Sequence, residues 1–78
     1  MKPTYHTYRG YVFTIGYEAR PPAYSVNFPD IPALITSGDT LAEAFANACE
    51  GLDLHLESLQ KLDQTLPKAR HRLILQGN

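Results

Sequence analysis

Three carboxylates are the residues whose type and placement could do chemistry in this sequence. Glu18, Asp30 and Asp39 each flank an expected turn, so folding could bring them together. A two-metal nuclease needs several such acids converging on divalent ions at a fixed spacing. However, Glu18 ends an expected strand on the side away from the core, and the two aspartates have evident turn and helix-capping roles. We therefore expect no catalytic residue, and a metal-dependent nuclease is the least favoured hypothesis.

The side chains that usually bind transition metals are scattered along the chain. His6, His55 and His71 form no closely spaced pair such as His-x-x-x-His, and Cys49 has no second cysteine beside it. No glycine-rich segment resembles a phosphate-binding loop. We expect no metal and no cofactor, and Cys49 is expected to be a small packed side chain rather than a nucleophile.

Length and charge limit the remaining classes of function. A chain of 78 residues predicts a single domain over residues 1–78, and a domain this small is only marginally stable alone, which favours a homo-oligomer. The formal net charge of −1 is not that of a protein that grips nucleic acid phosphates, so no direct nucleic acid contact is expected. No signal segment or membrane-spanning run is present, and the lone thiol fits a reducing compartment, so the expected location is cytoplasmic.

Alternating hydrophobic residues predict strands in the first half of the chain. Over residues 11–18, aromatic and aliphatic side chains occupy every second position, and a second alternation follows over residues 23–28. Arg20-Pro21-Pro22 separates the two, so an antiparallel hairpin is the economical interpretation. Ala33 to Thr36 is long enough for a third strand. Arg72 to Gln76 is expected to form the last strand, and residues 1–10 are left without an assigned structure.

The helix pattern is the strongest feature of the sequence. Thr40-Leu41-Ala42-Glu43 matches a capping box, although Asp39 could be the cap instead, and the helix is expected to run to about Leu62. Apolar residues recur along one of its faces at helical spacing. They are Leu41, Ala44, Phe45, Ala48, Leu52, Leu56 and Leu59.

These elements predict an α+β fold of order β-β-β-α-β, with one long helix packed on one face of a mainly antiparallel sheet. The aromatic sheet face, with Phe13 and Phe28, is expected to meet the apolar helix face. The opposite sheet face then has nothing left to cover it. It carries Thr14, Ser25 and Asn27, which we expect to face water or, slightly favoured, to take part in self-association.

The outer helix face is predicted to be acidic. Glu43, Glu50 and Glu57 are spaced by seven residues, and Leu54 lies among them on the side away from the core. Single exposed leucines are common, so an ordinary solvated face is the favoured interpretation of this pattern alone. The alternative is a docking strip with an apolar anchor, suited to a basic partner.

Two linked motifs resemble the signature of HicB-like antitoxins. The run Tyr24 to Pro32 ends a strand in Phe-Pro-Asp-Ile-Pro, and Ile35 to Ala44 opens the long helix through Thr-Ser-Gly-Asp-Thr-Leu-Ala-Glu-Ala. The resemblance covers about residues 11–62. It implies a partial RNase H-like β-β-β-α-β fold that is not a nuclease. It also implies a protein partner, HicA, a small basic toxin that cleaves mRNA, and this makes the acidic strip a stronger candidate for docking.

The chain departs from the family pattern in several places. Many members carry a C-terminal DNA-binding domain, whereas too few residues follow Leu62 here for one, so no separate domain of that kind is expected. Ala33 and Leu34 stand where the family often has glycine and cysteine. Arg20-Pro21-Pro22 replaces an acidic, glycine-containing hairpin turn. A stand-alone domain that self-assembles as a scaffold, or binds a small ligand, is therefore the alternative hypothesis.

Overall fold

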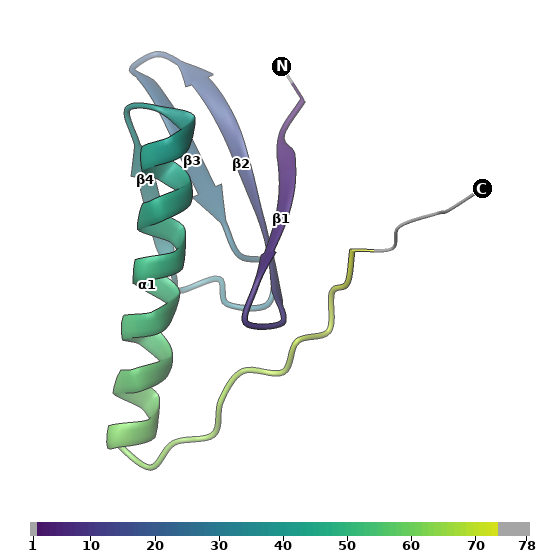
Figure 1. The fold of residues 1–78 in the computed structure, drawn as a ribbon, viewed down its shortest axis with the longest axis vertical. Coiled ribbons are helices and arrows are strands. Elements are labelled where there is room, and N and C mark those ends of the chain that lie inside the picture. Colours follow the sequence, from purple (N-terminus) through teal and green to yellow (C-terminus); the bar gives the residue numbers. More distant parts are fainter. Residues whose placement is uncertain (1, 74–78) are drawn as a thin grey trace, which may run out of the picture.

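A four-stranded antiparallel sheet and one long helix form the molecule (Figure 1). The computed structural model describes residues 2–73. The strands lie side by side in chain order, and the helix runs along one face of the sheet. The elements are β1 (Thr4–Tyr8), β2 (Tyr11–Ala19), β3 (Pro22–Asn27), β4 (Ile35–Gly38) and α1 (Leu41–Lys61).

The α+β class and the single helix on one face of an antiparallel sheet are confirmed, but the order of elements is β-β-β-β-α. At the N-terminus the structure contains an additional strand, β1, within residues 1–10, for which the sequence analysis assigned no structure. β1 pairs with β2 through a two-residue turn in which Arg9 and Gly10 have φ values of 52° and 85°. Positive φ at both central residues is what a tight hairpin between twisted strands requires.

The strand expected over residues 72–76 is absent at the two of its residues that the structure describes, Arg72 and Leu73. Arg72 and Leu73 lie in irregular structure, and residues 74–76 fall outside the described residues. The physical reason lies just upstream, where the backbone N–H groups of Arg70 and His71 donate to the Asp30 carboxylate instead of to a neighbouring strand. A segment whose donors are used by a side chain cannot offer them to a β-ladder.

The core forms between the inner face of α1 and the aromatic face of the sheet, as predicted. Phe13 and Phe28 are completely buried, with ring centroids 5.0 Å apart, and Leu52 packs in the same cluster. Burying each large side chain contributes roughly 1.5–3 kcal/mol. Leu41 and Phe45, at the start of the apolar stripe, are less covered than expected. They stay 44% and 40% exposed because α1 lies mainly against β3 and β4.

The start of α1 shows why glycine precedes it. The Glu43 N–H donates to Thr40 Oγ1 at 3.0 Å, and Glu43 Oε1 accepts from the Asp39 N–H at 3.2 Å, which confirms the capping box with Thr40 as the cap. A Cβ atom on Gly38 would lie 2.4 Å from the Ala44 nitrogen. Only glycine therefore lets the end of β4 pass this close to the first turn of the helix.

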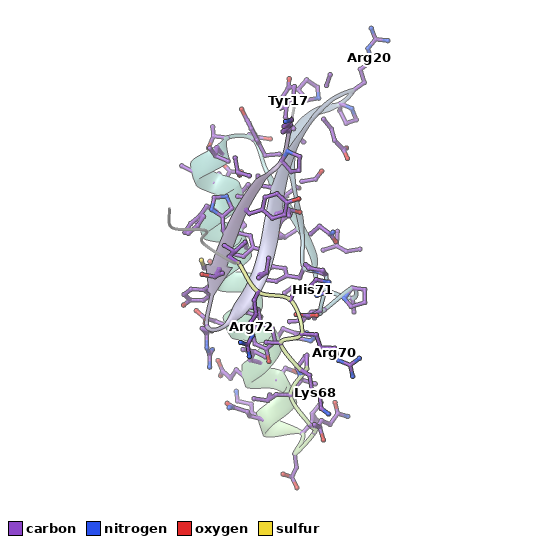
Figure 2. The ribbon with its side chains drawn as sticks, turned by 90° about the vertical axis from the view of Figure 1, so that its right-hand side faces the viewer. Tyr17, Arg20, Lys68, Arg70, His71 and Arg72 are labelled. Atoms are coloured by element: carbon purple, nitrogen blue, oxygen red, sulfur yellow. The ribbon has the colours of Figure 1, made fainter. Side chains whose placement is uncertain are left out.

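The chain after α1 returns across the far side of the sheet, where it is held by the turn before β4 (Figure 2). Asp30 Oδ2 accepts from the N–H groups of Arg70 and His71 at 2.9 and 3.0 Å, and Asp30 Oδ1 lies 2.6 Å from His71 Nδ1. The Tyr11 hydroxyl donates to the Pro67 carbonyl at 2.5 Å. We call residues 64–73 the tail, and the Asp30 contacts anchor it.

We predict that Gly38→Ala destabilises the domain, because the added methyl group must displace backbone of the first helical turn. The expected loss in the free energy of unfolding is about 1–3 kcal/mol, measured by urea denaturation. Gly16→Ala is the matched control, since its Cβ would meet only the Pro3 Cβ at an ordinary 3.8 Å. Equal stability of Gly38→Ala and the wild type would contradict the close contact.

Acid should release the tail. The hydrogen bond from the His71 N–H is the main cause that lowers the pKa of Asp30 below its usual 3.8. The anchor is therefore complete above about pH 4 and is lost as the pH falls through the lowered pKa. NMR amide shifts of Arg70 and His71, followed from about pH 6 to pH 2, should show this transition. Asp30→Asn should lack it, and an identical acid transition in that variant would show that another group is responsible.

Candidate functional site

The four residues predicted to bind a partner lie on one uncovered surface. Glu43, Glu50 and Glu57 are all exposed, and Leu54, which lies between the last two, is 59% exposed. With a rise of 1.5 Å per residue, this strip extends about 21 Å along α1. It lies opposite the buried stripe of the helix, so nothing in the described fold covers it. We call these four residues the acidic strip.

The three carboxylates of the acidic strip have different partners. Glu43 is engaged in the helix cap, and Glu57 lies 3.1 Å from Lys61 Nζ in an exposed i,i+4 ion pair that contributes little stability. Within residues 2–73, the Glu50 carboxylate makes no ion pair or side-chain hydrogen bond. Glu50 and Leu54, one turn apart, are therefore the part of the strip most available to another protein.

A second group of polar residues, which the sequence did not reveal, fastens the β1–β2 hairpin to the helix. The Tyr8 hydroxyl donates to Asp53 Oδ2 at 2.9 Å, and Arg9 Nη1 lies 3.0 Å from Asp53 Oδ1. The hydrogen bond to Asp53 is the main cause that raises the pKa of Tyr8. Burial, followed by the charge of Asp53, raises the pKa of the Cys49 thiol, which disfavours the thiolate form that a nucleophile needs.

The three carboxylates weighed for a nuclease have separate surroundings. Glu18 is exposed near the end of β2, Asp39 precedes the helix cap, and Asp30 anchors the tail. Within residues 2–73, no three histidine, cysteine, aspartate or glutamate side chains are grouped so that they could hold a metal ion.

The histidines have structural surroundings. The His6 ring stacks on Phe13 and meets Phe45 edge-on, with both centroid distances at 5.2 Å. His55 is half-buried on α1, and His71 belongs to the tail anchor.

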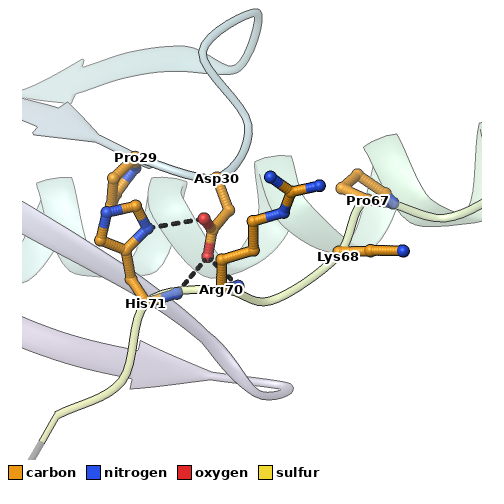
Figure 3. Close-up of a pocket in the computed structure, with 6 residues that line it drawn as sticks. All are labelled: Pro29, Asp30, Pro67, Lys68, Arg70 and His71. Carbon is orange, nitrogen blue, oxygen red and sulfur yellow. Dashed lines mark hydrogen bonds and ion pairs between the residues drawn. The ribbon is translucent and has the colours of Figure 1, made fainter.

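A pocket of about 560 Å³ opens where the tail meets the turn at Pro29 and Asp30 (Figure 3). Lys68 and Arg70 line it from the tail, and both side chains extend away from Asp30. The Asp30 oxygens are already used by the anchor, so the pocket presents mainly cationic groups. The sequence did not indicate this pocket because its two sides, the turn at Pro29 and Asp30 and the tail from Pro67 to His71, lie far apart in the chain. The available signal was the run of basic residues at alternating positions, Lys68, Arg70 and Arg72.

The residues predicted for self-association share the sheet face that α1 does not cover. Thr14 pairs directly with Asn27 across β2 and β3, and Ser25 pairs with Gly16 two residues farther along the same two strands, on the same face. Thr14 and Ser25 are half-buried, whereas Asn27 is exposed. We call this surface the open sheet face.

The described helix gives no membrane-spanning candidate, since it is not apolar enough over the length that a bilayer requires.

Comparison with known proteins supports the resemblance seen in the motifs. The chain is 44% identical over 46 residues to the "uncharacterized 14.9 kDa protein in rep-hol intergenic region" of Haemophilus phage HP1, a match that covers 59% of this chain and 35% of that protein. It is 38% identical over 45 residues to a UPF0150 protein of Thermoplasma acidophilum, covering 58% of this chain and 65% of the relative. The chain thus matches less than two thirds of the length of either relative.

No solved structure matches the chain. A family model described as "HicB_like antitoxin of bacterial toxin-antitoxin system" matches residues 11–75, which include β2, β3, β4, α1 and the tail anchor. Because this match spans most of the chain, the protein belongs to the family of HicB-like antitoxins of bacterial toxin–antitoxin systems.

Proposed function

We propose that this protein neutralises a HicA-type toxin by binding over the toxin's RNA-binding surface. Membership of the antitoxin family supports a toxin as the partner and a non-enzymatic role. The identity of the toxin and the mechanism of occlusion are our own inference. An mRNA-cleaving toxin acts where mRNA is translated, so the protein would act in the cytoplasm and would need no cofactor and no catalytic residue of its own.

The observation that carries this proposal is the acidic strip. A toxin that holds RNA must present cationic groups to the phosphates, and a protein surface that competes for those groups should be acidic. The outer face of α1 supplies carboxylates along its length, with Glu50 free of any ion pair in the described structure. Complementary charge would speed the encounter and orient the two proteins.

Leu54 would supply the apolar contact of the interface. It is 59% exposed in the centre of a charged surface, so burying it against a partner would remove apolar area from water. Full burial of such a side chain contributes roughly 1.5–3 kcal/mol, which is about a tenfold to hundredfold change in Kd. A helix that presents one leucine flanked by carboxylates also fits a groove bordered by basic residues.

The carboxylates that a nuclease would need to bind metal ions take part in structural hydrogen bonds or lie beside them. Both oxygens of Asp30 accept hydrogen bonds from the tail, and the Asp39 N–H is bound by Glu43. These contacts favour structural roles. Self-association would place two acidic strips on one assembly.

We predict that Leu54→Asp weakens toxin binding by at least about tenfold while the circular dichroism spectrum and the melting temperature stay those of the wild type. Isothermal titration calorimetry with a purified HicA-type toxin would measure the change. Leu62→Asp is the matched control, because Leu62 is 64% exposed but follows the end of α1, away from the strip. It should bind as the wild type does.

Two results would count against the proposal. Unchanged affinity of Leu54→Asp would remove the acidic strip from the interface, and failure of any HicA-type toxin to bind the wild-type protein would remove the toxin itself. A Glu50→Lys variant sharpens the electrostatic part, since it should slow association more than it speeds dissociation. An equal association rate at low salt would contradict charge steering.

A further inference from the structure

The pocket between the tail and the turn at Pro29 and Asp30, which we call the tail pocket, contains cationic side chains without a partner in the described fold. Lys68 and Arg70 both line it, and both side chains are exposed. Within residues 2–73, neither side chain takes part in an ion pair or a hydrogen bond. The tail pocket therefore holds two positive charges that are available to a ligand.

Asp30, the carboxylate that lines the tail pocket, is already engaged by other groups. Its Oδ2 accepts from the backbone N–H groups of Arg70 and His71 at 2.9 and 3.0 Å, and its Oδ1 lies 2.6 Å from His71 Nδ1. The Asp30 side chain is only 4% exposed, so its negative charge lies inside the anchor. The backbone of Arg70 binds Asp30, whereas the guanidinium extends away from it, as the Lys68 side chain does (Figure 3).

The two free cations suit a ligand group with two negative charges. An arginine guanidinium is a planar fork of N–H donors that can bind two phosphate oxygens at once, and a lysine ammonium adds a compact positive charge. A phosphate monoester carries a charge of about −1.5 to −2 near pH 7 and has three strong acceptor oxygens. Arg70 and Lys68 together therefore match one such group, whereas a single carboxylate would leave one of the two charges uncompensated.

The size and the other walls of the tail pocket leave room for an organic part beside the phosphate. Its volume of about 560 Å³ falls within the range of roughly 300–1,000 Å³ that is usual for small-molecule sites. Pro29 and Pro67 also line it and supply apolar ring surface. We propose that the tail pocket binds a small phosphorylated molecule, with Arg70 and Lys68 on its phosphate and the two proline rings against its organic part.

Nucleic acid matches the tail pocket less well than a small phosphate ester does. A strand carries one negative charge per phosphate, and gripping it requires basic groups that follow several phosphates in succession. Here two cations meet at one pocket, and the chain as a whole has a net charge of −1. No residue of the acidic strip lines this pocket, so binding here does not depend on the proposed toxin, and each proposal can be tested without the other.

Titration of the full chain with phenyl phosphate, followed by NMR amide shifts at about pH 7.5, tests the proposal because the anchor and the phosphate charge are both complete there. Saturable shifts at Asp30, Arg70 and His71 with a Kd of about 1 mM or below are expected. Arg70→Gln should weaken binding at least about tenfold, since it removes the guanidinium but keeps the backbone N–H that donates to Asp30. Arg72→Gln is the matched control, because it removes the same charge from the tail outside the pocket, and it should bind as the wild type does.

Four results would overturn the proposal. The first is the absence of saturable shifts at the tail pocket with phenyl phosphate at up to about 20 mM. The second is equal weakening by Arg70→Gln and Arg72→Gln, which would indicate attraction to the charge of the tail as a whole. The third is equal affinity for inorganic phosphate, which lacks the apolar part that would contact Pro29 and Pro67. The fourth is a single-stranded RNA oligonucleotide without a terminal phosphate that binds more tightly than phenyl phosphate and displaces it.

Discussion

The contact between the inner face of α1 and the aromatic face of the sheet is the constraint on which the rest of the molecule depends. Small residues allow the helix to lie close to the sheet at its N-terminal end, where Ala44 and Ala48 are completely buried and Gly38 has no room for a side chain. Two larger residues, Leu52 and Leu56, are buried farther along the helix. With one helix, only one face of the sheet is sealed, and the outer face of α1 and much of the opposite sheet face stay exposed.

The charges are divided between these surfaces. Carboxylates gather on and beside α1, three basic residues lie in the tail, and Thr14, Ser25 and Asn27 on the open sheet face carry no formal charge. The net charge of −1 is therefore the sum of an acidic surface, a basic surface and an uncharged one. The acidic strip is the surface whose charge would suit the basic partner proposed above.

Several contacts tie together segments that are far apart in the chain, and these shape the molecule beyond its core. Asp53 on α1 binds Tyr8 and Arg9 of the first hairpin, and Asp30 binds the backbone of the tail. Asp30 was predicted to be a turn residue, and no prediction was made for Asp53. Their partners lie more than 35 residues away, so no local pattern could have indicated them. The tail anchor also explains why an apolar alternation at the C-terminus did not become a strand at Arg72 and Leu73.

The sequence by itself determined the features that depend on neighbouring residues. Alternation predicted β2 and β3, the capping box predicted the start of α1, and helical periodicity predicted that Leu54 would be exposed opposite the core. Only the tertiary structure decided that residues 4–8 form an edge strand, and that one residue from each strand would line up across the open sheet face. Strand register depends on pairing between distant segments and on the seal made by the helix, and neither is encoded in the spacing of adjacent residues.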